Sequence, residues 1–215
     1  YLTLDEFKGR TPITRFGLEL PVGATSFDNP YSRGQLEGVT GGSRTRGTRI
    51  LLDLDDLDGE SAAGVLWLQA QQALHLPQLY WRAAAPAVGA LKWVLIWARE
   101  GIPIVRWYSQ TRPGLRRPGG LRGAIVHATT CALTTLAGHP TPYPRYAPMG
   151  AADRIARYLA RQTQKRVRLC VDTIVSSAVE LCQCAAQLDL DISGHVFRTF
   201  AEPLTPAKAA VIYRA

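Results

Sequence analysis

The sequence predicts a mainly α-helical protein, with a compact helical core between irregular, extended N-terminal and C-terminal arms. Residues 1–48 are rich in proline and glycine and lack sustained hydrophobic periodicity. The centre of the chain contains good helix formers, with apolar side chains recurring three and four residues apart. The last residues again lack a pattern. We therefore expect an extended arm over 1–48, a helical core domain over 49–198 and a C-terminal arm over 199–215.

Each core element follows from local composition. Acidic residues before and within a first helical turn complement the helix dipole, which supports a helix after the acidic run at 53–60. The next element is apolar nearly all round and should be buried. The predicted elements are, in chain order, a short strand near 49–54, a helix over 61–76, a buried apolar element over 79–98, minor β structure near 102–108, a buried helix over 121–137, and the longest helix signal over 151–188 with a break near 163–165.

The charge of the chain is concentrated in its middle. The 215 residues have a formal net charge of +8 and include 21 arginines and 4 lysines. Residues 61–150 hold 9 basic residues and one acid, Glu100. Such a basic field attracts polyanions, and guanidinium groups suit phosphate geometry. The composition excludes a disordered chain, four cysteines are too few for a disulfide scaffold, and the most apolar stretch is too short and interrupted to span a bilayer.

The sharpest basic pattern is a row at helical spacing. Its members recur at steps of 3, 4, 4 and 3 residues, so on a helix they share one face about 21 Å long. Like charges at this spacing repel unless an anion relieves them, and a phosphate backbone would do so. The alternative is an ordinary solvated helix face. The row consists of Arg154, Arg157, Arg161, Lys165 and Arg168.

A loop rich in proline and glycine holds a second basic group. Backbone N–H groups of such a loop can help to cradle phosphate, although it lacks the spacing of a P-loop. Arg44, Arg46 and Arg49 form a third, weaker group. Phosphate contacts set position and affinity without reading bases, so no sequence specificity is expected. The loop group consists of Arg112, Arg116, Arg117 and Arg122.

An acidic motif offers a different interpretation. The run 50–55 resembles the first metal-binding motif of archaeo-eukaryotic primases and related plasmid replicases, and 86–97 resembles their second motif. The resemblance covers roughly residues 50–100 and implies that Asp53 and Asp55 bind a divalent metal and that Lys92 contacts phosphate. Lys92 stands where that family has histidine, and no acid lies between Glu100 and Asp153 to supply a third motif.

We therefore expect a structural assembly protein that coats or packages nucleic acid, of the viral capsid or nucleocapsid type. Its expected partners are nucleic acid, with RNA slightly favoured over DNA, and copies of itself in a large homo-oligomer. We expect no membrane partner, no cofactor, no metal and no catalytic residues. It would act in a virion or the host cytoplasm and would not be secreted. The alternative is a metal-dependent primase or replicase domain of the plasmid or phage type.

Overall fold

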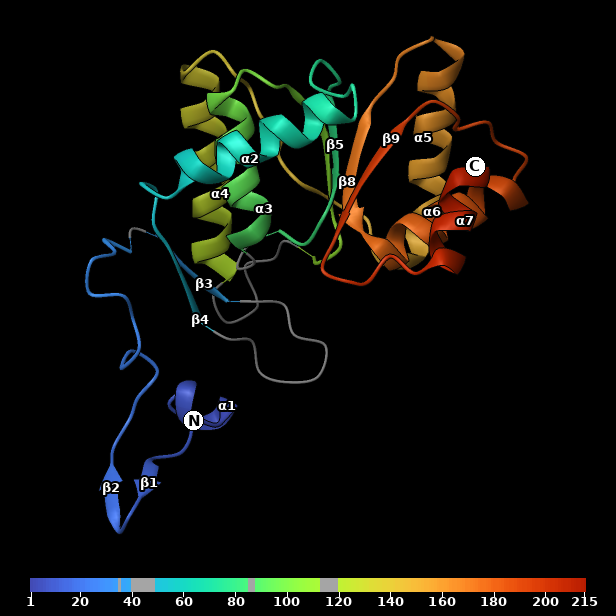
Figure 1. Cartoon of the computed structure of the whole chain (residues 1–215). Coiled ribbons are helices and arrows are strands. Elements are labelled where there is room, and N and C mark those ends of the chain that lie inside the picture. Colours follow the sequence, from blue (N-terminus) through green and yellow to red (C-terminus); the bar gives the residue numbers. More distant parts are fainter. Residues whose placement is uncertain (35, 40–48, 85–87, 113–119) are drawn as a thin grey trace.

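A computed structural model describes residues 1–34, 36–39, 49–84, 88–112 and 120–215. Within these ranges, a central sheet of five parallel strands lies between two layers of helices, so the protein belongs to the α/β class and the expected mainly α class is wrong (Figure 1). The strands of this sheet are β5 Gln78–Trp81, β6 Ile104–Ser109, β7 Arg145–Tyr146, β8 Cys170–Ile174 and β9 Val196–Phe200.

Helices connect the strands. The sheet order is β7-β6-β5-β8-β9. The first strand of this sheet along the chain, β5, therefore lies in its centre, and later strands are added outward on both sides. This is the doubly wound order of Rossmann-type folds, in which parallel strands require crossover connections. The helices are α2 Leu57–Ala70, α3 Val88–Arg99, α4 Gly120–Leu136, α5 Ala152–Gln164, α6 Val175–Gln187 and α7 Pro206–Arg214, with a short 3-10 turn, η1 Met149–Ala151, before α5.

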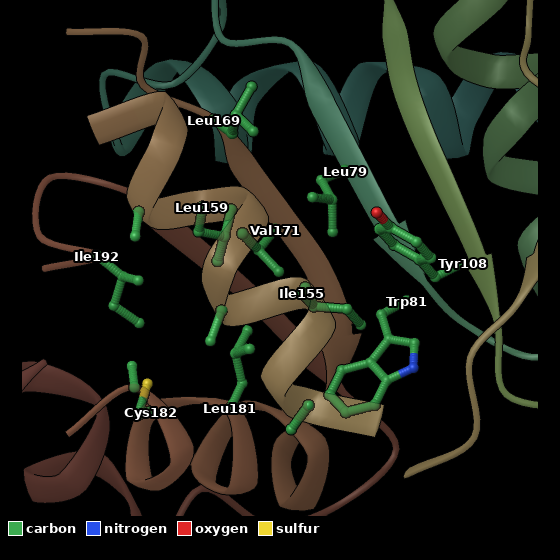
Figure 2. Packing of buried hydrophobic residues seen from close by; sticks show 14 of the residues in the cluster. Leu79, Trp81, Tyr108, Ile155, Leu159, Leu169, Val171, Leu181, Cys182 and Ile192 are labelled. Carbon is green, nitrogen blue, oxygen red and sulfur yellow. The ribbon is translucent and has the colours of Figure 1, made fainter. Parts of the chain in front are cut away.

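Each face of the sheet has its own apolar core. Helices α2, α3 and α4 lie on one side of the sheet and α5, α6 and α7 on the other (Figure 1). Figure 2 shows Ile155 and Leu159 of α5 beside Leu79 and Val171 of the sheet. Because side chains alternate along a strand, Tyr80 faces the opposite core, formed with α2 and α3. The sheet is therefore covered on both faces.

The apolar element expected over 79–98 is two elements. Its start is strand β5, whose four residues are all buried, and helix α3 follows from Val88. A central parallel strand is buried on both faces, so its sequence is a continuous apolar run without alternation. Such a run cannot be distinguished from a buried helix by periodicity. That ambiguity explains the wrong fold class.

Two further expectations, the helix over 151–188 and the irregular C-terminal arm, also differ from the structure. The helix expected over 151–188 is α5, then β8, then α6. Helix α5 ends at Gln164, because Arg166 adopts a left-handed φ of 58°. The C-terminal segment is not an irregular arm: β9 pairs with β8 in the sheet, and α7 packs against α6.

The N-terminal arm extends away from the sheet and has structure of its own (Figure 1). It contains α1 Leu4–Phe7, an antiparallel hairpin of β1 Ile13–Arg15 and β2 Leu18–Leu20, and β3 Leu36–Val39 paired with β4 Arg49–Leu52. Local contacts hold it together, and the Arg15 Nη1 group donates to Glu6 Oε1 at 2.8 Å. Gly9, at φ +63°, packs so tightly on Gly23 that a Cβ atom would lie 2.1 Å from the Gly23 carbonyl carbon.

Candidate nucleic-acid interface

Helix α5 presents part of the predicted basic row to solvent. Its buried face, which includes Ile155 and Leu159, packs on the sheet, while Arg154, Arg157 and Arg161 are exposed. These three side chains project from the helix away from its buried face, as their spacing predicts.

The row does not continue as one helical face. Lys165 is the residue that caps the C-terminus of α5, and Arg168 lies beyond the left-handed turn at Arg166. The Arg168 Nε group donates a hydrogen bond to the Gly194 carbonyl at 2.7 Å, in the loop before β9. All five predicted residues are nevertheless exposed along the same segment of the chain.

The exposed cations of this segment have no acidic partners. We define the basic surface by seven residues that are all exposed and that, within the part of the chain that the structure describes, form no ion pair with a carboxylate. Several other exposed arginines differ, since Arg10 pairs with Asp5 and Arg99 with Asp58, whereas Arg112 and Arg214 are exposed and form no such ion pair among the described residues. The members of the basic surface are Arg145, Arg154, Arg157, Arg161, Lys165, Arg166 and Arg168.

One residue of the predicted loop group meets the row. The guanidinium carbon of Arg112, just after β6, lies 5.0 Å from the centre of the Tyr146 ring in β7. Arg154 of α5 donates a long hydrogen bond of 3.5 Å to the Tyr146 carbonyl, and its guanidinium carbon lies 5.5 Å from the Tyr108 ring. Two groups that are distant in the sequence therefore converge at the carboxyl ends of β6 and β7.

For most of the other predicted basic residues, the residue or its side chain lies outside the described part of the chain. Arg116 and Arg117 lie outside the described residues, and so do Arg44 and Arg46. Arg122 belongs to the first turn of α4, but its side chain is not described. Arg49 forms ion pairs with Asp28 at 2.6 Å and with Glu37 at 3.3 Å, so it differs from the unpaired residues of the basic surface.

The acidic motif has local hydrogen-bond partners. Asp53 is buried just after β4, and its Oδ2 accepts hydrogen bonds from Ser32 Oγ and from the Arg33 amide, both at 2.9 Å. Its Oδ1 accepts from the Asp55 amide at 3.0 Å. The described residues contain no group of three or more potential metal ligands. These contacts make Asp53 an anchor between the arm and β4.

Lys92, in the second motif at 86–97, is also paired. Lys92 Nζ lies 2.5 Å from Glu60 Oε2, which joins α3 to α2. Its ammonium group lies 6.0 Å from the centre of the Trp93 ring. Lys92, expected from the resemblance to contact phosphate, therefore has an acidic partner that links two helices.

A buried charged cluster that no local sequence pattern reveals lies on the face of the sheet covered by α2 and α3. Asp172 in β8 is fully buried, with Arg82 Nη1 at 2.9 Å from its Oδ1 and Arg198 Nη1 donating to its Oδ2 at 3.0 Å. Burial raises the pKa of Asp172, and the two guanidinium groups oppose part of this shift. The available signal was one aspartate in the apolar run 169–175, since buried carboxylates are rare unless paired.

Aromatic rings enclose the two arginines of this cluster. The Arg198 guanidinium carbon lies 3.6 Å from the centre of the Trp93 ring, and that of Arg82 lies 3.8 Å from the Phe200 ring centre. Such cation–π contacts stabilise buried guanidinium groups. The cluster therefore ties β5, β8 and β9 to α3.

A cavity beside the edge strand β9 borders both groups of arginines: its lining includes Gly194, whose carbonyl accepts from Arg168, and Trp67, whose ring centre lies 5.9 Å from the Arg198 guanidinium carbon. It has a volume of about 350 Å³ and follows β9 between α2 and α7. Its walls are mostly apolar and include Trp67, Phe197 and Ile212. None of the seven cations of the basic surface is among the described residues that line this cavity.

Within the described ranges, no helix is long and apolar enough to cross a membrane. Comparison of the chain with protein-family models, with curated proteins and with solved structures finds no match.

Proposed function

We propose that the protein binds the phosphate backbone of nucleic acid, without sequence specificity, through the basic surface. The observation that supports this is the set of seven exposed cations between residues 145 and 168 that have no acidic partner among the described residues. Unpaired like charges repel, and a polyanion relieves that repulsion while releasing its condensed counterions.

The shape of the basic surface favours a polymer over a small anion. Helix α5 runs from the carboxyl ends of β6 and β7 toward the start of β8, and its cations follow the same course. Arg112 and Tyr146 extend the surface at one end. Residues 154–168 span a distance comparable to several phosphates of a nucleic-acid strand, since such phosphates recur at about 3.4 Å along each strand of a duplex.

The test compares two variants with equal loss of charge. Arg154, Arg157 and Arg161 are changed to Gln in one variant, and the ion-paired surface residues Arg10, Arg33 and Arg99 are changed to Gln in the other. Fluorescence anisotropy with a labelled 20-nucleotide RNA gives log K against log salt concentration. We expect the first variant to lower the magnitude of the slope by about 2, since each single-strand phosphate contact contributes about 0.7.

The matched variant should retain nearly the slope of the unaltered chain. Equal slopes for both variants would show that only the total charge matters, and the basic surface would then not be the binding site. The same titration with single-stranded DNA of equal length tests the slight preference for RNA.

We further propose self-association through the N-terminal arm. The arm extends from the rest of the chain (Figure 1) and exposes a set of large apolar side chains, which marks interaction surfaces in soluble proteins. Together with nucleic-acid binding, self-association would suit a capsid or nucleocapsid subunit in a virion or the host cytoplasm. The exposed set is Tyr1, Leu2, Leu4, Phe7, Phe16, Leu18, Leu20, Phe27 and Tyr31.

Light scattering coupled to size-exclusion chromatography tests this second proposal. We expect the unaltered chain to form oligomers, and Phe16→Ser with Leu18→Ser and Leu20→Ser to reduce their mass. Leu66→Ser with Leu133→Ser and Leu136→Ser is the matched control, because these three exposed leucines lie on α2 and α4. A monomer of 23.5 kDa for the unaltered chain, with and without RNA, would reject the assembly proposal.

A further inference from the structure

Strand β9 forms an open edge of the central sheet. It pairs with β8 on one side, and no strand of the described residues pairs with it on the other. The Val196 amide donates to the Leu169 carbonyl, just before β8, at 3.0 Å. Because peptide groups alternate in direction along a strand, those of Phe197 and Thr199 face away from β8. β9 therefore presents the amides and carbonyls of two residues to the open edge.

The cavity beside β9 turns this edge into a groove with two apolar walls. Phe197 and Thr199 line the cavity, together with Trp67 of α2 and Ile212 of α7. Helices α2 and α7 cover opposite faces of the sheet (Figure 1). A strand added to β9 would therefore point alternate side chains toward α2 and toward α7. An unpaired sheet edge of this kind is a template for an extended segment.

The N-terminal arm contains a strand with a second open edge. All three residues of β2, Leu18–Leu20, are exposed. β2 follows a two-residue turn at 16–17, where both φ values are positive, 49° and 80°, as in a type I′ hairpin. The pair that closes such a turn, Arg15 with Leu18, is the hydrogen-bonded one, so the peptide groups of Glu19 face away from β1. β2 therefore offers one outward amide and one outward carbonyl at Glu19.

The two edges match in hydrogen bonding and in charge. In a parallel pair, the Glu19 amide would donate to the Phe197 carbonyl, and the Thr199 amide to the Glu19 carbonyl. This register places Glu19 opposite Arg198, with both side chains on the α2 face of the sheet. Glu19 has no ion pair among the described residues, and Arg198 shares the single carboxylate of Asp172 with another arginine. The charges of the two edges are therefore complementary.

The leucines of β2 would meet the other wall of the groove. Leu18 and Leu20 flank Glu19, so they point to the opposite face of the strand. In the same register they lie opposite Phe197 and Thr199, on the face of the sheet that α7 covers. Leu18 is 68% exposed and Leu20 is 56% exposed in the arm. Their burial in the groove would remove apolar surface from water, which favours association.

We propose that β2 of one copy of the chain adds to β9 of a second copy as a sixth, parallel strand of its sheet. This contact, which rests on the self-association proposed above, gives the arm a defined receiving surface. Within one copy the hairpin of β1 and β2 lies well apart from β9 (Figure 1), so each groove is free for the arm of another copy. Reciprocal exchange of arms gives a closed dimer, and one-way exchange gives an open chain of copies.

Filling the cavity tests the receiving surface. Ala209→Trp places a large ring at a position of α7 that lines the cavity. Ala210→Trp is the matched control, because Ala210 is exposed and is not among the described residues that line it. Light scattering coupled to size-exclusion chromatography over a range of concentrations measures association. We expect Ala209→Trp to weaken it by about tenfold or more and Ala210→Trp to leave it unchanged. Circular dichroism and thermal melting establish that both variants are folded.

A second variant tests strand pairing separately from cavity filling. Thr199→Pro removes the outward N–H group and leaves the hydrogen bonds to β8 in place, since proline is tolerated where the N–H of an edge strand faces outward. Thr199→Val keeps the amide and the shape of the side chain and is the control. We expect association to weaken severalfold in Thr199→Pro and to persist in Thr199→Val. Glu19→Lys should weaken association more than Glu19→Gln, because it brings a second cation to Arg198.

Mixing two defective variants tests whether the contact joins two copies. The variant with Phe16→Ser, Leu18→Ser and Leu20→Ser has an altered arm and an intact cavity, and Ala209→Trp has an intact arm and a filled cavity. Their mixture can form one complete contact, which neither variant can form alone. With a fluorescent label on the first variant, sedimentation velocity should detect a mixed species only in the mixture. Absence of a mixed species would contradict the proposal.

The remaining outcomes separate this contact from self-association in general. If Ala209→Trp and Ala210→Trp associate equally while the altered arm weakens association, the arm binds another surface, and only the β9 contact is rejected. A monomeric unaltered chain rejects both proposals. Full association of Thr199→Pro would also overturn strand addition, because the leucines would then enter the cavity without pairing with β9.

Discussion

Two groups of arginines in this protein occupy opposite environments. Arg82 and Arg198 are enclosed beneath α3, paired with Asp172 and covered by aromatic rings. The arginines of the basic surface are exposed and have no carboxylate within reach among the described residues. A buried guanidinium group requires a partner because desolvation is costly, whereas an exposed one keeps its hydration. The same side chain thus supports the fold in one region and is available to a ligand in the other.

The largest expected effect comes from removing the shared partner of the buried pair. Asp172→Asn leaves two buried guanidinium groups without a counter-charge, which should lower the free energy of unfolding by about 3–5 kcal/mol. Urea denaturation measures this change. Asp189→Asn, at an exposed turn, is the control and should change stability little. A loss below about 1 kcal/mol in Asp172→Asn would show that the cluster is hydrated rather than desolvated.

A smaller effect is expected from the aromatic layer over Arg198. Gly64 of α2 lies so close to α3 that a Cβ atom would be 2.7 Å from Trp93 Cζ3 and 2.9 Å from Trp97 Cη2. Gly64→Val should therefore destabilise the protein by about 1–3 kcal/mol through overpacking. Gly59→Val, in the same helix with open space around it, controls for helix propensity. Equal thermal shifts for the two variants would contradict close packing of α2 on α3.

The basic surface should be nearly neutral for stability. Changing Arg154, Arg157 and Arg161 to Gln removes no ion pair, so each substitution should alter the free energy of unfolding by no more than about 0.5 kcal/mol. Low salt sharpens the measurement, because repulsion between these residues is least screened there. A large loss of stability in urea would show that the basic surface has a structural role, and it would then no longer differ in this respect from the buried pair.

The smallest effect is expected for Arg15 of the N-terminal arm, which is ion-paired like the buried arginines but partly exposed like those of the basic surface. Arg15 is paired yet 44% exposed on its side chain, and its guanidinium group, with the Thr3 amide, lowers the pKa of Glu6 to about 2 from an ordinary 4.5. A carboxylate with a lowered pKa stabilises the folded arm above its ordinary pKa. This contribution is lost progressively as the pH falls from 4.5 toward 2.

Amide exchange at Thr3 and Glu6, followed by NMR from pH 5 to pH 2, measures that loss. Glu6→Gln should remove the pH dependence, whereas Asp5→Asn, beside it on an exposed side chain, should preserve it. Persistent protection of the Thr3 amide at pH 2 would show that the arm does not depend on the Glu6 and Arg15 pair.

Local patterns identified several elements correctly. The helix expected over 121–137 is α4 at 120–136, and β structure expected near 49–54 and 102–108 is found as β4 and β6. These segments have clear boundaries of proline, glycine or charge. In contrast, the sequence pattern did not distinguish strand β8 from helix, because Cys170 and Ile174 by coincidence continue the four-residue spacing of the flanking helices.

The candidate sites divide in the same way. The sequence by itself determined that Arg154, Arg157 and Arg161 share an exposed helix face, because helical periodicity depends only on spacing. Only the tertiary structure decided that Arg112 and Arg154 both contact Tyr146, and that Arg82, Asp172 and Arg198 form one cluster. Strand order brings together residues more than a hundred positions apart, and no local pattern encodes that order.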